Sequence, residues 1–189
     1  MRNRGWLNWL GSALIVGGAV ILVFHLWTLY QGMVAQQRAK EWLSRKVAVN
    51  SPAPAQPVRR GGVIGELEIP RLQLSVMVFE GDDGGILRQG AGHIPGTALL
   101  PRSGNIGIAA HRDTFFRPLR GIHTNDIIDL KTRAGTSRYT VTEAKIVRPS
   151  DVSVLAQAPG RDLTLVTCYP FYYVGSAPER FIVHARKIG

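Results

Sequence analysis

The sequence is poor in cysteine and in acidic residues. Cys168 is the only cysteine among 189 residues, so the protein has no internal disulfide and contains neither a CxxC pair nor a Cys/His cluster at zinc-binding spacing. Asp and Glu number 13 against 23 Lys and Arg, which gives a formal charge of +10. That excess suits an anionic partner such as a lipid headgroup or a cell-wall polymer, and equally an ordinary basic surface beside a membrane.

Several motif classes are missing as well. The aromatic residues do not alternate with basic runs as a nucleic-acid stacking platform requires, and no DNA- or RNA-binding motif occurs. GxSxG, HExxH and phosphate-binding loops are absent too. The acids of EGDDGG, which are Glu80, Asp82 and Asp83, fit turn chemistry better than a Ca²⁺ site. We therefore expect no nucleic-acid partner, no metal and no cofactor.

One stretch lacks charge altogether. Residues 10–30, LGSALIVGGAVILVFHLWTLY, contain no Lys, Arg, Asp or Glu and are long enough, at about 1.5 Å per helical residue, to span a hydrocarbon layer of about 30 Å. Trp27 and Tyr30 close the stretch as in an interfacial aromatic belt. The sequence favours an uncleaved membrane anchor at residues 1–32. The alternative, a cleaved signal peptide, would have a shorter apolar region and a small-residue cleavage site.

Residues 33–62 are predicted to link the anchor to the rest of the protein. They have helical composition at first and then read VNSPAPAQPVRRGG. Pro52, Pro54 and Pro57 predict a semi-extended spacer that holds the next domain away from the bilayer. The basic residues on the two sides of the anchor do not decide its orientation.

From residue 63 to residue 189 the pattern changes to short β-rich runs separated by turn residues. Helical composition is confined to short pieces near residues 84–90, 115–121 and 150–157. Many short strands in one domain predict a closed β-barrel or a sandwich. The runs cover residues 64–69, 72–79, 105–110, 126–132, 137–147, 163–169 and 180–187.

Cys168 lies at the end of one of these runs. Because Tyr169 is followed by Pro170, and proline cannot continue a strand ladder, the backbone is expected to leave the sheet here. Reactive groups favour such junctions, although a lone cysteine is commonly a small buried apolar residue. A free thiol is mostly protonated at neutral pH, so a nucleophilic role requires a nearby cation.

His111 has the same expected setting as Cys168. It follows the apolar run 105–110 and opens a polar stretch, so it too is expected at a strand end. Asp113, two residues later, is expected to point elsewhere, to the surface. The other histidines lie in the anchor, a Gly/Pro-rich loop, a polar turn and the last strand, where a structural role is expected: His25, His93, His123 and His184.

Arg180 is the candidate cation. It begins the last β-rich run, and the preceding segment YPFYYVGSAPE is long enough for a loop that folds over the strand ends. A guanidinium placed there can hold a peptide carbonyl and stabilise an oxyanion. The ordinary alternative is a surface cation paired with Glu179.

Together these residues resemble the sortase family. TLVTC matches Thr-Leu-x-Thr-Cys, ERF supplies the arginine of the following strand, AAHRDTFFRPL matches the histidine segment, and LEIPRLQLSVMV looks like the opening strands. The likeness covers about residues 63–189 in the order His, Cys, Arg. HRDTFFRPL and TCYPF are most similar to class D-like sortases, including those of Gram-negative bacteria. The resemblance implies a closed eight-stranded sortase-type β-barrel with short helices, preceded by an N-terminal transmembrane helix.

The resemblance also implies a membrane-anchored cysteine transpeptidase. Cys168 would be the nucleophile that attacks the Thr carbonyl of an LPxTG-like sorting signal and forms a thioester. His111 would be the general acid and base, and Arg180 the oxyanion or substrate-orienting residue. Thr167 would contact the peptide or shape the site, and the backbone N–H of Tyr169 would be a second oxyanion donor. The aromatic residues that follow would belong to a loop that roofs the peptide groove.

The implied partners are surface or secreted proteins with a C-terminal LPxTG-like signal, an amine acceptor that the sequence does not name, and the membrane. A single pass through the cytoplasmic membrane would leave the catalytic domain outside the cytoplasm. Papain-like proteases have the order Cys then His, and L,D-transpeptidases hold the two residues within one compact motif, so both fit less well. The alternative to an enzyme is a non-catalytic envelope-anchored barrel that binds a peptide or a polymer and keeps Cys168 for packing.

Overall fold

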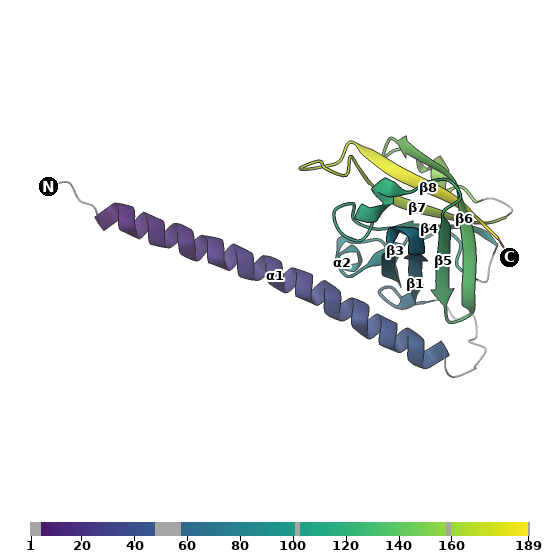
Figure 1. The fold of residues 1–189 in the computed structure, drawn as a ribbon, viewed down its shortest axis with the longest axis horizontal. Coiled ribbons are helices and arrows are strands. Elements are labelled where there is room, and N and C mark those ends of the chain that lie inside the picture. Colours follow the sequence, from purple (N-terminus) through teal and green to yellow (C-terminus); the bar gives the residue numbers. More distant parts are fainter. Residues whose placement is uncertain (1–4, 48–57, 101–102, 158–159, 189) are drawn as a thin grey trace.

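In the part of the protein that the computed structural model describes, residues 5–47, 58–100, 103–157 and 160–188, eight short strands close into a barrel (Figure 1). The strand order is β1-β2-β3-β4-β7-β8-β6-β5, which confirms the predicted eight-stranded barrel. Closure removes the free sheet edges that would otherwise pair with other proteins. The strands are β1 (Val63–Ile69), β2 (Leu74–Glu80), β3 (Ala91–His93), β4 (Gly104–Ala109), β5 (Ile127–Thr132), β6 (Gly135–Val147), β7 (Arg161–Tyr169) and β8 (Glu179–Lys187).

Seven strands coincide with the predicted β-rich runs, and β3 is the one that the sequence did not predict. It pairs in parallel with β2 and antiparallel with β4, and all of its residues are buried. Three residues between glycines are too few to show an alternating pattern. His93, which we expected in a loop, is therefore a buried strand residue whose ring lies 3.0 Å from Glu80 and 2.9 Å from Thr97.

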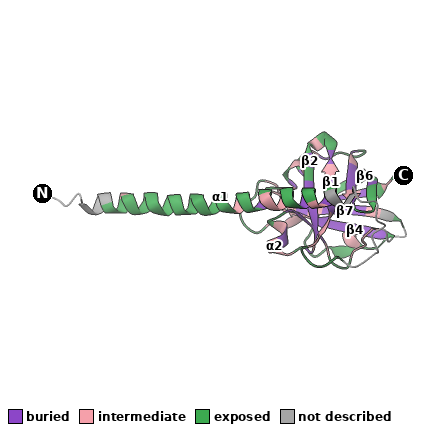
Figure 2. Cartoon of the chain, turned by 90° about the horizontal axis from the view of Figure 1, so that it is seen from below, coloured by how far each residue is buried: buried purple, intermediate pink, exposed green. Residues whose placement is uncertain are grey.

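The core of the barrel comes from alternate residues of the strands. Leu67 and Ile69 of β1, and Leu163 and Leu165 of β7, belong to one cluster of buried side chains inside it. In Figure 2, where buried residues are purple, this colour is concentrated in the barrel and not in the first half of α1. Short helices lie where helical composition was found: α2 (Gly84–Leu87), η2 (Arg117–Gly121) and η3 (Val152–Leu155).

The acidic turn before α2 has a structural role. Asp83 accepts hydrogen bonds from the N–H groups of Gly85 and Ile86 and so caps this short helix. Its carboxylate also pairs with Arg60 at 2.8 Å, while Glu80 faces His93. Two of the three acids, Asp83 and Glu80, therefore have structural roles as a helix cap and as ion-pair partners.

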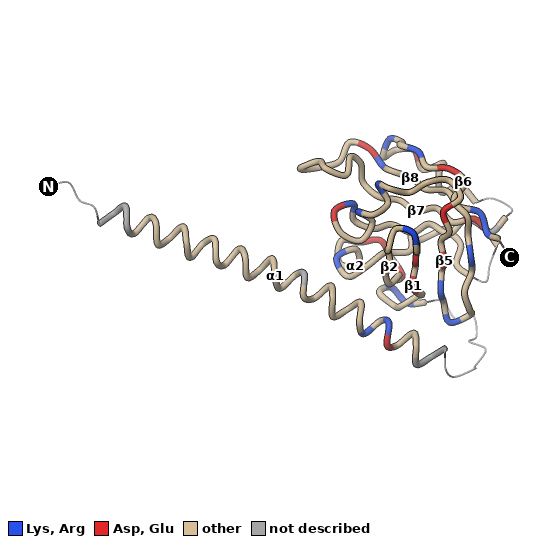
Figure 3. The backbone as a smooth tube through the Cα atoms, in the orientation of Figure 1, with Lys and Arg blue, Asp and Glu red and all other residues tan. Residues whose placement is uncertain are grey.

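The N-terminal segment is one continuous helix, α1 (Gly5–Val47), of 43 residues. Its first half extends away from the barrel with exposed apolar side chains, and it is long and apolar enough to cross a membrane (Figures 1 and 2). The charged residues drawn on α1 lie near its C-terminal end (Figure 3). Residue 32, the predicted end of the anchor, therefore lies inside an unbroken helix.

The second half of α1 packs against the barrel, which the sequence did not predict. Ala39 and Leu43 are buried in a small cluster with Met77 and Phe79 of β2 and Ile86 of α2. We expected the proline-rich stretch within residues 33–62 to hold the barrel away from the bilayer, and residues 36–43, which precede that stretch, contact the barrel directly. The proline-rich part of the predicted spacer lies mainly within residues 48–57, outside the described residues.

Polar contacts flank this packed cluster. Gln36 Oε1 accepts the Met77 N–H at 2.7 Å, and Lys40 Nζ lies 2.7 Å from Glu66 and 2.9 Å from Ser75. Burial raises the pKa of Glu66, but hydrogen bonds from Lys40 and Ser75 lower it, and the net shift is downward. We call this contact, formed by Gln36, Lys40 and the buried cluster, the helix seam. It fixes the direction of α1 relative to the barrel.

Candidate active site

Cys168 and Arg180 are brought together by the pairing of β7 with β8. The two strands are antiparallel, and Cys168 and Arg180 are directly opposite each other in the register. Side chains at directly opposed positions lie on the same face of a sheet with Cβ atoms about 5 Å apart. Both residues are half-buried, so both are partly accessible from that face.

His111 reaches the same place by way of β4. This strand runs parallel to β7 with Ala109 level with Val166, and the Ala110 N–H continues the ladder by donating to Val166 O at 3.2 Å. Two residues beyond Ala109 and Val166 are His111 and Cys168. The histidine segment therefore leaves the sheet beside the cysteine, as the two strand ends predicted.

Thr167 links these two segments. Its side chain is only 2% exposed, and its hydroxyl donates to Ala110 O at 2.7 Å. This hydrogen bond holds the backbone immediately before His111. We expected Thr167 either to contact the peptide or to shape the site, and its role stays a prediction.

Cys168 faces away from the barrel interior. Leu163 and Leu165 belong to the core cluster, and Thr167 has the same parity along β7. Because successive side chains of a strand point to opposite faces, Cys168 lies on the outer face. A thiol on the outer face at a strand end is available to a reactant, whereas one in the interior would serve packing.

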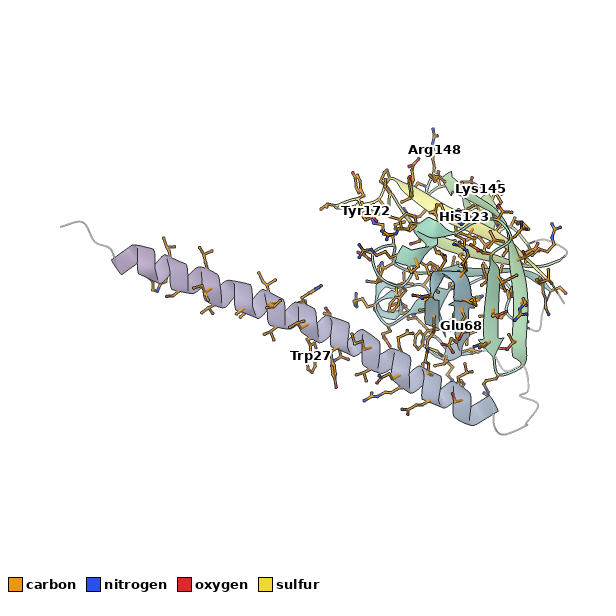
Figure 4. The ribbon with its side chains drawn as sticks, in the orientation of Figure 1. Trp27, Glu68, His123, Lys145, Arg148 and Tyr172 are labelled. Carbon is orange, nitrogen blue, oxygen red and sulfur yellow. The ribbon has the colours of Figure 1, made fainter. Side chains whose placement is uncertain are left out.

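The aromatic residues beside Cys168 divide into two groups. The rings of Tyr169, Phe171 and Phe181 pack together with centroids 5.3 to 6.3 Å apart, and both phenylalanines contact the barrel core. Phe171 is therefore packed against the barrel core, and the loop that roofs the peptide groove stays a prediction. Only the residues that follow it project into solvent, among them Tyr172 (Figure 4).

The guanidinium of Arg180 is held by backbone oxygens. Its Nη1 donates to Glu179 O at 2.9 Å and to Ala177 O at 3.3 Å. These acceptors carry no formal charge, so the contacts orient the guanidinium without neutralising it. The oxyanion role of the Tyr169 N–H stays a prediction.

Arg112 is a residue of this region that the sequence analysis missed. Its Nη2 donates to Tyr173 O at 2.6 Å and to Gly175 O at 3.1 Å, and its guanidinium lies 5.7 Å from the centroid of the Tyr173 ring. The residue next to His111 thus holds the loop between β7 and β8. It is part of AAHRDTFF, but no sequence pattern marks an arginine whose partners are backbone carbonyls.

The remaining titratable candidates have other surroundings. His184 lies within β8, 3.0 Å from the Thr164 hydroxyl, and burial, with repulsion from Lys145, lowers its pKa below the ordinary value. Asp113 is exposed, as expected, and His123 lies exposed in a turn (Figure 4). Within the described ranges, no cluster of three or more His, Cys, Asp or Glu side chains could hold a metal ion.

Comparisons with known sequences all point to one protein family. A family model for the sortase domain matches residues 67–188. Sortase D of Bacillus subtilis is 35% identical over 129 residues, covering 68% of this chain and 65% of that protein. Sortase A of Streptococcus agalactiae is 31% identical over 132 residues, covering 65% of this chain and 52% of that protein. The matched part of this sequence thus spans between about half and two thirds of the length of these curated relatives.

Comparisons with solved structures agree. The protein is similar to a Clostridium perfringens Sortase D5 transpeptidase with a TM-score of 0.70 and 25% identity, covering 85% of this chain and 99% of that one. It is also similar to a sortase of Actinomyces oris with a TM-score of 0.65 and 30% identity, covering 74% of this chain and 87% of that one. The class D relatives in both comparisons confirm the class D-like resemblance.

Proposed function

This chain belongs to the sortase family, and on that premise we propose that it is a membrane-anchored cysteine transpeptidase. It would cleave an LPxTG-like sorting signal after Thr and transfer the protein to an amine. The observation that carries this proposal is the strand register: Cys168 lies opposite Arg180, and β4 delivers His111 to the same end of the barrel.

The first half of the reaction forms a thioester. The Cys168 thiolate attacks the Thr carbonyl carbon, and Arg180 stabilises the negative charge that develops on the carbonyl oxygen. As the peptide bond after Thr breaks, His111 gives its proton to the leaving amine. The products of this half are a released peptide with a free amino group and an acyl group on Cys168.

The second half transfers the acyl group. A primary amine attacks the thioester carbonyl, His111 accepts a proton from the attacking nitrogen, and Cys168 leaves as the thiolate. A new amide bond forms, and His111 and Cys168 return to their starting protonation states. Thr167 acts in both halves by holding the backbone at Ala110 and thereby the position of His111.

The first half of α1 is the proposed anchor. It would cross the cytoplasmic membrane once and leave the barrel outside the cytoplasm, where surface or secreted proteins carry the sorting signal. Because Cys168 is the only thiol, a membrane-impermeant maleimide reagent tests the orientation directly. Labelling of intact cells or spheroplasts, absent from the Cys168→Ala variant, is the expected result. Labelling that appears only after lysis would contradict this orientation.

The acyl-enzyme provides the test of the enzyme activity. The full-length protein in detergent is incubated with a panel of LPxTG-like peptides, quenched with acid and weighed intact by mass spectrometry. We expect a mass increase equal to the peptide fragment that ends in Thr, released by hydroxylamine and absent from Cys168→Ala.

The opposite result would favour a different function. Peptide binding without any thioester across the panel, together with a thiol that resists alkylation, would indicate a non-catalytic envelope-anchored barrel. In that case Cys168→Ala would leave peptide binding unchanged.

A further inference from the structure

The loop between β7 and β8 carries a group of exposed apolar and aromatic side chains at its tip. Tyr172 is 74% exposed, Tyr173 46% and Val174 97%. We call these three residues the loop tip. Side chains of this kind, gathered on one projection instead of scattered over a surface, mark a place where the protein meets an apolar or interfacial partner.

Cations lie behind the loop tip. The Arg120 guanidinium is 5.5 Å from the centroid of the Tyr172 ring, and that of Arg112 is 5.7 Å from the Tyr173 ring. Arg112 also donates to two backbone carbonyls of the loop, so the tip is held from the barrel side. Tyrosines in front of arginines combine an amphipathic ring with a phosphate-binding charge, which is the chemistry of a membrane interface.

The loop tip points toward the side on which α1 leaves the barrel. In Figure 1 the loop between β7 and β8 and the first half of α1 both extend to the left of the barrel, while the C-terminus lies on the right. Figure 2, turned about the horizontal axis, shows α1 extending to the same side. Because the helix seam fixes α1 on the barrel through Gln36, Lys40 and the buried cluster, this shared direction is built into the fold.

From these observations we infer that the loop tip contacts the headgroup region of the same bilayer that the first half of α1 crosses. Tyr172, Tyr173 and Val174 enter the interface, and the exposed Arg120 faces anionic phosphates behind them, while Arg112 holds the loop from the barrel side. The inference rests on the proposed function, which places the first half of α1 in the bilayer. Its consequence is that Cys168, a few residues before the tip, works at the membrane surface.

A depth measurement on the full-length protein tests this contact without any catalysis. Cys168→Ser removes the only native thiol, and single cysteines are then placed at Val174, at Val20 in the exposed first half of α1, and at Ile188 beyond the far end of β8. Each variant carries an environment-sensitive fluorophore and is reconstituted in nanodiscs containing phosphatidylglycerol. Lipids with a spin label in the headgroup or deep in the acyl tail serve as quenchers.

Headgroup-labelled lipids should quench the fluorophore at position 174 at least about threefold more than the one at position 188, while acyl-tail labels should quench position 20. Equal, weak quenching at positions 174 and 188 with strong quenching at position 20 would overturn the inference and leave the anchor intact. Weak quenching at all three positions would overturn both the anchor and the loop contact.

A matched pair of substitutions sharpens the measurement. Tyr172→Ser removes an interfacial ring from the tip, and Val152→Ser removes an exposed apolar side chain from η3. With the fluorophore at position 174, Tyr172→Ser should roughly halve the headgroup quenching and Val152→Ser should leave it unchanged. An equal effect of the two substitutions would count against a specific contact through the loop tip.

Discussion

The β7–β8 strand pair carries two polar sites with opposite properties. Near the middle of β7, Thr164 lies opposite His184, and close to its end Cys168 lies opposite Arg180. All four side chains share one face, because each pair is directly opposed and the positions along β7 differ by an even number. The same ladder thus makes two sites, and the difference between them lies in what surrounds each one.

The first site is closed. Thr164 is fully buried, and its hydroxyl donates to Asn105 Oδ1 at 2.8 Å and lies 3.0 Å from His184 Nδ1. Asn105 Nδ2 donates in turn to Val154 O of η3, which lies over this part of the face. A satisfied network of this kind stabilises the fold, because each member would be costly to leave unpaired.

The second site is open. Here the strands end, the cysteine is half-buried, and the observed hydrogen bonds of the Arg180 guanidinium are to backbone oxygens. A polar group becomes reactive when it is positioned by its neighbours but kept available to a ligand. The comparison teaches that a strand pair positions the side chains of both sites, while the covering segments decide which site can react.

The two histidines should show the largest contrast. His111→Gln removes the proposed acid and base, so single-turnover acylation should fall about 10²- to 10⁴-fold. His184→Gln changes the closed site, so acylation should stay within about twofold while the melting temperature drops by a few degrees. Mass spectrometry of the acyl-enzyme and thermal unfolding in detergent measure the two effects. Similar acylation losses in the two variants would remove the distinction between the sites.

The next comparison is between the two arginines of β8, Arg180 and Arg186. Arg180→Gln should lower kcat/KM about 10²-fold, since one oxyanion donor is lost. Arg186, an exposed residue near the far end of β8 whose Nε lies 4.0 Å from Asp162, provides the control, and Arg186→Gln should leave kcat/KM unchanged.

The kinetic constants separate the two roles proposed for Arg180. A fall in kcat indicates oxyanion stabilisation, whereas a rise in KM alone indicates substrate orientation. Wild-type values of both constants in Arg180→Gln would refute either role.

Substitution of the two threonines of β7 should have smaller effects, on stability for Thr164 and on acylation for Thr167. Thr164→Val removes the hydroxyl that donates to Asn105 Oδ1 and lies beside His184 Nδ1, and it should cost about 1–3 kcal/mol of stability with acylation unchanged. Thr167→Val removes only the hydrogen bond to Ala110 O and should slow acylation about tenfold by loosening His111.

Thr167→Ser supplies the matched control, because it keeps the hydroxyl and should restore acylation. Loss of acylation in Thr164→Val, or failure of serine to rescue Thr167, would show that the division between a stabilising and a positioning threonine is wrong.

The sequence could predict those features that depend on residues close together along the chain. Short β-rich runs between turn residues identified seven strands, uninterrupted apolar length identified the first part of α1, and Pro170 marked the end of β7 just after Cys168. These patterns are local. The order His, Cys, Arg then matched a family, which supplied the eighth strand that three residues of β3 could not reveal.

The parts that the sequence did not predict depend on contacts between distant segments. Lys40 and Gln36 look like ordinary solvent-exposed helix residues until β1 and β2 provide Glu66 and Met77. Phe171 looks like a loop residue until Phe181 and the barrel core provide its surroundings. Register and docking are set by the packed structure, so the closing of one polar site and the opening of the other could not be predicted from β7 and β8 alone.

The smallest expected effect is the pH dependence of stability that arises from His184. Burial and repulsion from Lys145 lower the pKa of His184 below its ordinary value of 6.5, although Glu143 and Asp162 oppose the shift. The unfolded protein therefore takes up this proton first as the pH falls, so the stabilising contribution is present above about pH 6.5 and is lost below it.

Carboxylates with lowered pKa values, Glu66, Asp83 and Asp126, lose their contributions only at lower pH, because their ordinary pKa values are 4.5 and 3.8. Thermal unfolding between about pH 7.5 and pH 5.5 should thus show a decline of a degree or two that His184→Gln flattens. A decline of full size in His184→Gln would mean that the closed site does not resist protonation, and the contrast between the two polar sites would then rest on catalysis alone.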